Sequence, residues 1–202
     1  MVSQTEKFAR LFRGLEKAYG AVDIAHGPNG TKQKGRYKFV QEERTLETFE
    51  AHLEGKTSIG IVPINEKNEC IWGAIDIDTY PLDHSEIVRK IGKLKFPLVL
   101  CRSKSGGGHI YLFMKDFVAA EKIQSKLKEL ASELGYAANT EVFPKQIKLV
   151  LERGDNGNFL NLPYFDHEGG LRYAIKSDGS AATLEEFLEM AEGSAITEEE
   201  LE

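Results

Sequence analysis

Residues Cys70 to Asp78 read CIWGAIDID, an apolar run that closes on two aspartates. β-branched and aromatic residues are frequent in the run, and its length suits a strand. Because side chains alternate along a strand, Asp76 and Asp78 face one side, roughly 7 Å apart, and the isoleucine between them faces the other. The run therefore predicts a strand that brings two carboxylates to one place at its end.

Composition and length set the class of protein. The chain has 202 residues, of which 41% are hydrophobic and 29% charged, as in a globular protein with one sizeable core or two fused lobes. No apolar run approaches the roughly 20 residues of a membrane-spanning helix, so we expect a soluble cytoplasmic protein without a membrane partner. Cys70 and Cys101 form no C-x-x-C pair, which argues against a disulfide framework or a zinc site and indicates buried thiols.

The net charge of −6 is unevenly distributed along the chain. Nine of the 32 acids lie from Asp178 to Glu202, where there is no lysine or arginine, so residues 1–177 hold 23 acids against 26 bases. Within that mildly basic body, residues 26–38 (HGPNGTKQKGRYK) contain lysines and an arginine but no acid, which predicts a flexible basic loop. Such a loop could follow a phosphate backbone or be an ordinary surface loop.

The first half of the chain predicts two helices and a hairpin. Apolar residues at three- and four-residue spacing predict an amphipathic opening helix over residues 8–20 and a short helix over residues 46–55. The run Ser58–Ile64 (SIGIVPI) and the run Cys70–Asp78 are separated by the polar turn NEKNE and predict a hairpin.

A second hairpin follows a helix predicted over residues 85–94. Its strands, Leu98–Arg102 and His109–Met114, are joined by SKSGGG, whose glycines permit a tight turn. An apolar stripe then predicts a helix over residues 119–134. Later apolar runs predict short strands over 147–151, 159–162 and 171–175, and an acidic helix over 184–190.

The order of these elements predicts the fold class. Helices alternate with strands and several hairpins occur, so we expect an α+β protein with a mixed or antiparallel sheet rather than a doubly wound parallel one. We expect one domain over residues 1–193 and an acidic, disordered tail over residues 194–202.

The two aspartates are candidates for a metal site. Like charges placed close together repel, and a hard divalent cation bound by oxygen ligands relieves that repulsion, as in two-metal enzymes. Asp76 and Asp78 therefore predict a Mg²⁺ or Mn²⁺ site. A strand end with two solvated aspartates is the alternative, so the hypothesis depends on partner motifs.

The first partner motif is RSKSGGGHIYLF, residues 102–113. Hydroxyls, a lysine and backbone donors of the glycine turn, followed by His109, together suit a triphosphate. The Walker pattern and the dinucleotide-binding glycine pattern are both absent. A structural hairpin with a hydrogen-bonded histidine is the alternative, and Tyr111 and Phe113 are expected in the core.

The second partner motif is NTEVFPKQ, in which Glu141 stands in a short predicted strand before Pro144. Val142 and Phe143 would fix this strand in the core, and the carboxylate could be a third metal ligand. Taken alone, Glu141 would be interpreted as a surface glutamate, so the order of the three motifs carries the argument.

In that order the three motifs resemble the catalytic motifs of the archaeo-eukaryotic primase superfamily. The chain is most similar to the primase-polymerase branch, which includes CRISPR-associated or TOTE-type enzymes and phage or plasmid enzymes. The flanking segments HLEGKTSIGIVP (residues 52–63) and GNFLNLPYF (residues 157–165) extend the resemblance over about residues 45–190. Many members carry Asp where this chain has Glu141, some have a compact S-x-H motif, and zinc-binding cysteines are absent here, which favours polymerisation over primer initiation.

The resemblance implies a catalytic core with an RRM-like sheet, a smaller N-terminal α/β lobe, and a nucleotide in the cleft between them. It implies Mg²⁺ or Mn²⁺, as two ions and without zinc, held by Asp76, Asp78 and Glu141. The implied nucleotide-binding residues are Ser103, Lys104, Ser105, His109 and Asn161, with Lys145, Gln146 and Asn158 as weaker candidates. Arg172 could face the same cleft, but a strand arginine is more often a solvated side chain, so we leave it out of the primary site.

The resemblance also implies the substrates. These are a single-stranded DNA or RNA template with its primer and dNTPs or NTPs, and an accessory domain or a helicase partner is left open. Two other functions are weighed against this one. A two-metal nuclease would use the same carboxylates, and a non-catalytic RRM-like module would bind single strands through KGRYKFV (residues 34–40), where Arg36 replaces an expected aromatic residue.

Overall fold

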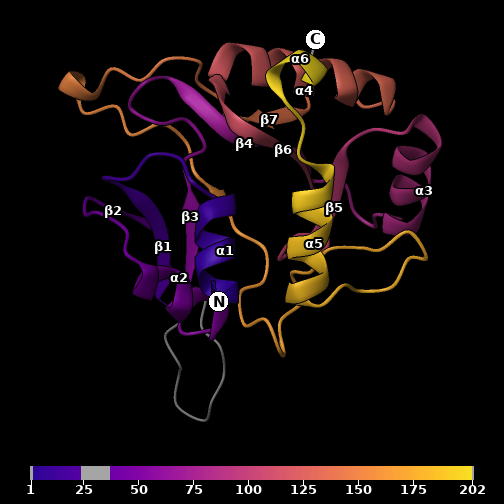
Figure 1. The fold of residues 1–202 in the computed structure, drawn as a ribbon, viewed down its shortest axis with the longest axis horizontal. Helices are drawn as coiled ribbons and strands as arrows, with labels where there is room; N and C mark the ends of the chain where they lie inside the picture. Colours follow the sequence, from indigo (N-terminus) through magenta and orange to yellow (C-terminus); the bar gives the residue numbers. More distant parts are fainter. Residues whose placement is uncertain (1, 24–36, 202) are drawn as a thin grey trace.

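The computed structural model describes residues 2–23 and 37–201, which form two four-stranded sheets that lie side by side (Figure 1). The β1 sheet has the order β2-β1-β3-β8 and consists of β1 (Tyr19–Asp23), β2 (Tyr37–Val40), β3 (Thr57–Ile61) and β8 (Leu160–Asn161). The β4 sheet has the order β5-β6-β4-β7 and consists of β4 (Glu69–Ile77), β5 (Leu98–Arg102), β6 (Gly108–Ala119) and β7 (Glu141–Phe143). The helices are α1 (Gln4–Leu11), α2 (Leu46–Leu53), α3 (His84–Leu94), α4 (Ala120–Glu133), α5 (Leu184–Ser194) and α6 (Glu198–Leu201).

The β4 sheet has the topology of an RRM-like fold. Its elements follow one another as β4-α3-β5-β6-α4-β7, and every pairing within the sheet is antiparallel. This β-α-β-β-α-β succession is that of ferredoxin-like and split β-α-β domains. The prediction of an α+β protein with an RRM-like sheet is therefore confirmed, as are the second hairpin and the helices around it.

Alternation along β4 gives the sheet an outer and an inner face. On the outer face α4 packs so closely that a Cβ atom on Gly73 would meet Ile123 and Leu127 at 2.7 Å. On the inner face Trp72 is fully buried, and its ring contacts Phe12 with centroids 5.3 Å apart. Trp72 and Asp76 therefore lie on the same face of β4, with Trp72 in the core and Asp76 near the end of the strand.

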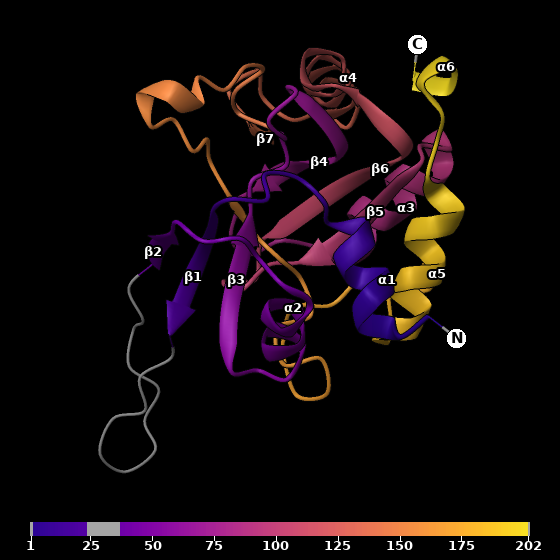
Figure 2. The ribbon, with the colours of Figure 1, turned by 60° about the vertical axis from the view of Figure 1, so that its left-hand side comes forward.

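An aromatic cluster fills the space between the inner face of the β4 sheet and the helices α1 and α5, which lie beside each other (Figure 2). Phe12 lies near its centre, because its ring is within 6.2 Å of the rings of Trp72, Tyr111, Phe113 and Phe187. Tyr111 and Phe113 are buried, as their apolar neighbours in the sequence predict. Cys70 and Cys101 are also buried as free thiols.

The opening helix ends earlier than predicted. It stops at Leu11, and the chain continues irregularly to β1. The reason is the close approach of Val62, whose carbonyl accepts a hydrogen bond from the Leu15 N–H at 3.0 Å and leaves only 2.1 Å for a Cβ atom on Gly14. Phe12 and Leu15 stay buried, so their spacing reflects the core rather than a continuous helix.

The first predicted hairpin is wrong, because β3 and β4 belong to different sheets. The turn between them exists: the Asn65 carboxamide oxygen accepts the N–H groups of Lys67 and Glu69 at 2.8 and 2.9 Å. However, β3 ends at Ile61 and the next residues cross from one sheet to the other. Two later predicted strands are also absent: residues 147–150 are irregular and lead into a 3₁₀ turn at residues 151–153, and residues 171–175 make only isolated bridges.

The end of the chain is more ordered than predicted. The Lys115 N–H donates to the Ile196 carbonyl at 2.8 Å, which attaches the tail to β6. Leu201 is buried, and Glu198 forms an ion pair with Lys122 at 2.9 Å, so that α6 lies beside α4 (Figure 1). Glu198 thus has a basic partner on α4, and Glu200 has one on β6, since Lys115 Nζ lies 3.7 Å from its carboxylate. Among the helices of the described residues, none has the length and apolarity needed to cross a membrane.

The contact between β4 and α4 can be tested with two glycine substitutions. Gly73→Ala is expected to destabilise the protein by about 1–3 kcal/mol, because the new methyl group overlaps with α4 and with the Phe143 carbonyl. Gly92→Ala on the exposed face of α3 has no atom within 4 Å and is expected to stabilise by about 0.5–1 kcal/mol. Urea unfolding of both variants measures the difference, and equal effects would contradict this packing.

Candidate active site

Three of the predicted residues form one row across the β4 sheet. In the register of the strands, Asp76 on β4 lies opposite His109 on β6 and opposite Glu141 on β7. Directly opposed residues of antiparallel strands share a face of the sheet. The motifs that are far apart in the sequence therefore meet because β4 is a central strand with β6 and β7 as its neighbours.

The Asp76 carboxylate is mostly buried and poorly compensated. Its side chain is 14% exposed, and in the described part of the chain its Oδ1 atom has no hydrogen-bond partner. His109 Nε2 lies 3.4 Å from this oxygen. Burial raises the pKa of Asp76 to about 6, and the charges of Asp78 and Glu141 add to this shift, while Lys145 opposes it.

Asp78 and Glu141 hold less constrained positions. The Tyr80 hydroxyl donates to Asp78 Oδ1 at 3.0 Å. The Glu141 side chain is 57% exposed, and Lys145 Nζ lies 2.7 Å from its carboxylate. Within residues 2–23 and 37–201, no three acidic, histidine or cysteine side chains are gathered closely enough to hold a metal ion as they stand.

The donor set nevertheless fits a hard divalent cation. Asp76 presents an oxygen that is buried and without a donor, and Asp78 adds a second carboxylate on the same face. Carboxylate oxygens are the ligands that Mg²⁺ and Mn²⁺ prefer, and a cation would compensate the repulsion that raises the pKa of Asp76. Glu141 lies beside them in the sheet, with its carboxylate paired to Lys145.

The glycine turn packs against the end of β4. The Ser103 N–H donates to the Gly107 carbonyl at 2.9 Å and the Gly106 N–H to the Ser103 carbonyl at 3.1 Å, which closes a tight turn. Gly106 has φ = +94°, a conformation that favours glycine. A Cβ atom on Gly107 would lie 2.3 Å from the Ile77 carbonyl, so this turn can touch the strand between the two aspartates only as glycine.

His109 is held from two sides. Its Nδ1 atom shares a hydrogen bond of 3.2 Å with the hydroxyl of Tyr111, which is fully buried in the core. Burial lowers the pKa of His109 to about 4, and the positive charge of Arg172 contributes to the same shift. His109 is therefore neutral near pH 7, with its ring anchored to the sheet and Nε2 directed toward Asp76.

These residues line one cavity of about 230 Å³ between the two sheets. Among the predicted residues, seven line it: Asp76, Asp78, Ser103, Lys104, Ser105, His109 and Asn161. Asn161 comes from β8 of the β1 sheet, and its Oδ1 atom is buried with no hydrogen-bond partner among the described residues. Asp76 and Asn161 thus face the cavity from different sheets, each with an unpaired oxygen atom.

The weaker candidates lie outside this cavity. Lys145 pairs with Glu141, and Glu141 itself does not line the cavity. Gln146 and Asn158 bind each other, since the Gln146 side-chain amide donates to the Asn158 carboxamide and accepts from the Asn158 N–H. Their contacts fix the loops around residues 146 and 158 to each other.

Sequence reasoning missed Arg172, which was expected to be solvated. The residue is 7% exposed and lines the cavity, where Nη1 donates to Ser58 Oγ at 2.9 Å and its guanidinium stacks on Phe165 at 5.2 Å. Its neighbour Leu171 is 61% exposed. The charged Arg172 is buried and the apolar Leu171 is exposed, which is the reverse of what their hydrophobicity predicts. No local sequence pattern could therefore have identified Arg172 as a residue of the site. Arg102 and Tyr37 also line the cavity and were not singled out.

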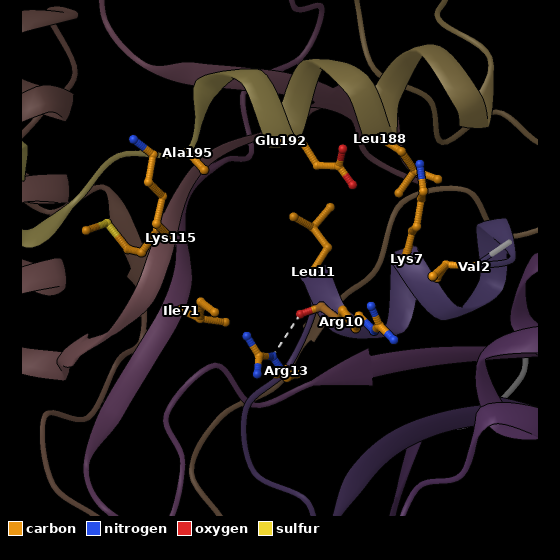
Figure 3. A pocket seen from close by; sticks show the side chains of 11 residues that line it. Val2, Lys7, Arg10, Leu11, Arg13, Ile71, Lys115, Leu188, Glu192 and Ala195 are labelled. Carbon is orange, nitrogen blue, oxygen red and sulfur yellow. Dashed lines mark hydrogen bonds between the residues drawn. The ribbon is translucent and has the colours of Figure 1, made fainter.

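A second hollow of about 320 Å³ lies where α1, α5 and β6 meet, away from the predicted residues (Figure 3). It has an apolar floor that includes Leu11 and Leu188, and a charged rim to which Lys7, Arg10 and Glu192 belong. None of the predicted catalytic or nucleotide-binding residues lines it. The cavity between the sheets is therefore the candidate active site.

Comparison with known proteins agrees with the motif order. The family model described as the archaeo-eukaryotic primase domain of TOTE conflict systems matches residues 6–190. Among solved structures, the archaeo-eukaryotic primase domain of the cyanophage S-2L primase-polymerase is similar, with 10% identity and a TM-score of 0.45 over 93% of this chain and 96% of that chain. No curated protein matches the chain.

The buried charge of Asp76 predicts a pH-dependent effect on stability. Its pKa of about 6 in the folded protein exceeds the usual 3.8, so the folded state keeps a proton that the unfolded chain releases. Stability is thus lost as the pH rises through this window, by on the order of 2 kcal/mol above pH 6. Asp76→Asn is expected to raise the Tm at pH 7.5, with a gain that shrinks toward pH 4.

Calorimetry over pH 4–8 measures this effect. The matched control is Asp116→Asn, at an exposed position on β6, which is expected to change stability by less than about 0.5 kcal/mol. A Tm gain of Asp76→Asn that is the same at pH 4 and at pH 7.5 would contradict the burial of an uncompensated carboxylate.

Proposed function

We propose that this chain, which belongs to the archaeo-eukaryotic primase domain family of TOTE conflict systems, catalyses template-dependent nucleotidyl transfer. The substrates are dNTPs or NTPs and a primer on a single-stranded DNA or RNA template. One observation carries the proposal: Asp76, Asp78, His109 and residues 103–105 of the glycine turn line a single cavity together with Asn161. Carboxylates for a metal and donors for a triphosphate are thereby adjacent, as polymerisation requires.

Asp76 and Asp78 would hold Mg²⁺ or Mn²⁺, with Glu141 beside them as a third ligand. A bound pair of such ions lowers the barrier by activating the primer 3′ hydroxyl and by neutralising charge on the α-phosphate and the departing pyrophosphate. The protein contributes rigidity: β4 is fixed on one face by α4 and on the other by the aromatic cluster. Asp76 is therefore held in place before the substrate arrives.

The triphosphate would lie along the glycine turn. Ser103 and Ser105 offer hydroxyl groups, and Lys104 offers a positive charge at the exposed rim of the cavity. His109, neutral and anchored by Tyr111, would donate a hydrogen bond from Nε2 to a phosphate oxygen. Arg172 adds a buried positive charge on the opposite side, which favours the binding of an anion.

The β1 sheet would contact the remainder of the nucleotide. Asn161 donates from Nδ2 to the Tyr37 hydroxyl at 3.2 Å, while its buried Oδ1 stays available as an acceptor. An acceptor at this position suits a sugar hydroxyl or a base N–H group. We assign Lys145, Gln146 and Asn158 no direct contact with the nucleotide, because none of them lines the cavity and each is paired outside it, Lys145 with Glu141 and Gln146 with Asn158.

Primer extension tests the proposed function. The wild-type protein is expected to extend a labelled primer on single-stranded template with Mg²⁺ or Mn²⁺ and nucleotides, and Asp76→Asn with Asp78→Asn is expected to lose at least about 100-fold of this activity. The control Asp116→Asn should keep it. Extension by the double variant at the wild-type rate would refute the metal-binding role, and shortening of the primer without nucleotides would indicate a nuclease instead.

A second test addresses His109. His109→Ala is expected to raise the KM for the nucleotide about tenfold, because a hydrogen bond to a charged phosphate is lost. The Kd for the primer-template should change little. Steady-state kinetics and anisotropy measure the two quantities, with the exposed His167→Ala as the control. An unchanged KM would remove His109 from the nucleotide site.

A further inference from the structure

Two aromatic side chains on the edge strand β2 are exposed without an evident structural role. Tyr37 is 44% exposed and Phe39 is 36% exposed, within the KGRYKFV segment that faintly resembles a nucleic-acid-binding pattern. A single exposed apolar residue is ordinary, whereas a contiguous exposed patch of such residues marks a binding surface. Both lie next to the candidate active site, since Tyr37 lines its cavity.

A third ring extends this surface across the β1 sheet. Gly20 and Gly60 are direct partners on β1 and β3, and a Cβ atom on either would lie 2.5 or 2.3 Å from the ring of Phe159. Because the two glycines have no side chains, the Phe159 ring packs directly against the backbone of β1 and β3. Phe159 lies 6.0 Å from Tyr37 and 5.3 Å from Phe39 between ring centroids, so the three rings form one aromatic surface.

The aromatic surface, made of Tyr37, Phe39 and Phe159, continues into the cavity. Phe39, Gly20, Gly60 and Asn161 are successive partners across the four strands of the β1 sheet, so they share one face. Asn161 lines the cavity and binds the Tyr37 hydroxyl. A ligand that lies on the rings is thus led toward the position that the nucleotide would occupy.

The charges around the aromatic surface indicate which partner it fits. Lys104 Nζ lies 5.9 Å above the Tyr37 ring, and the buried Arg172 lines the adjoining cavity. Aromatic faces beside positive charges match the stacked bases and the phosphates of a single strand. No acidic side chain lines this end of the cavity among the described residues, since its two acids, Asp76 and Asp78, belong to the β4 sheet.

We propose that single-stranded nucleic acid stacks its bases on the aromatic surface of Tyr37, Phe39 and Phe159, and that this is the path by which a template strand enters the active site. The path rests on the proposed function, since the strand acts as template only if the cavity polymerises nucleotides. The stacking itself does not require catalysis, metal or nucleotide, and it reads no sequence because every base has an aromatic face.

The test is the binding of fluorescein-labelled oligo-dT and oligo-rU, measured by anisotropy in EDTA and without nucleotides. Phe39→Ala is expected to weaken binding about tenfold, the loss typical of one stacked base. Phe39→Trp should restore it. Leu94→Ala, which removes an exposed side chain at the end of α3, is the matched control and should bind as the wild type does.

Two further readouts separate stacking from other causes. Phe39→Ala removes no charge, so the slope of the logarithm of the binding constant against the logarithm of the salt concentration should be unchanged, whereas Lys104→Ala should lower it by about one. Circular dichroism and the Tm show whether Phe39→Ala stays folded, as expected for an exposed edge residue. A folded Phe39→Ala protein with wild-type affinity for both oligonucleotides would overturn the proposal.

The outcome is independent of the polymerase assay. The binding assay contains no metal and no nucleotide, so it reports on stacking whether or not the protein extends a primer. If the wild-type protein binds single strands through Phe39 but extends no primer, the aromatic surface stands and the polymerase function fails. If extension is normal and Phe39→Ala binds and extends as the wild type does, the polymerase function stands and the aromatic surface is not the template path.

Discussion

The arrangement of this protein depends on one constraint: the Asp76 carboxylate is held in the sheet between His109 and Glu141, and its buried Oδ1 atom has no hydrogen-bond donor among the described residues. A fold selected for stability alone would place a neutral or paired side chain there, because an uncompensated buried charge is costly. The surrounding structure keeps Asp76 in place, since β4 has α4 packed against Gly73 on one face and Phe12 against Trp72 on the other. The energy to hold the charge therefore comes from packing on both sides of one strand.

The two walls of the cavity belong to different sheets. The β4 sheet contributes the acids, His109 and the glycine turn, whereas the β1 sheet contributes Asn161. Arg172 reaches the same cavity and is bound to Ser58 of β3. In this arrangement one wall would bind the metal and the phosphates, and the other wall the remainder of the nucleotide and the template strand.

Local patterns predicted the β4 sheet well and the β1 sheet poorly, for physical reasons. The strand before Asp76 and the glycine turn before His109 are specified by neighbours in the sequence, through β-branched residues and backbone conformation. By contrast, β3 and β4 are joined by a turn but belong to different sheets. Each strand pairs with strands that are distant in the sequence, and neither stretch of sequence indicates these partners. The predicted length of the opening helix was wrong for a similar reason, because the Leu15 N–H donates to the carbonyl of Val62, a residue distant in the sequence.

In the candidate site, too, residues in recognisable motifs were predicted, whereas residues placed by long-range contacts were not. The resemblance of the motif order predicted which residues meet, and the strand register brings Asp76, His109 and Glu141 into one row. The role of Arg172 could not be predicted, because its burial depends on contacts with Ser58 and Phe165. Ser58 is remote in the sequence, and no local sequence pattern links Arg172 to Phe165. The pairing of Glu141 with Lys145 was likewise invisible, since two charges four residues apart are also common on solvated surfaces.

The most direct test of the central claim is the position of Mn²⁺ in crystals of the protein with a non-hydrolysable dNTP analogue. Anomalous scattering locates the ion without any assumption about activity. The account predicts a peak at about 2.0–2.3 Å from an Asp76 carboxylate oxygen, with Asp78 as a second ligand and the triphosphate along the Ser103–Gly107 turn. A nucleotide bound in the cavity with no Mn²⁺ at Asp76, or with Mn²⁺ held only by other residues, would contradict the assignment of this cavity as a metal-dependent active site.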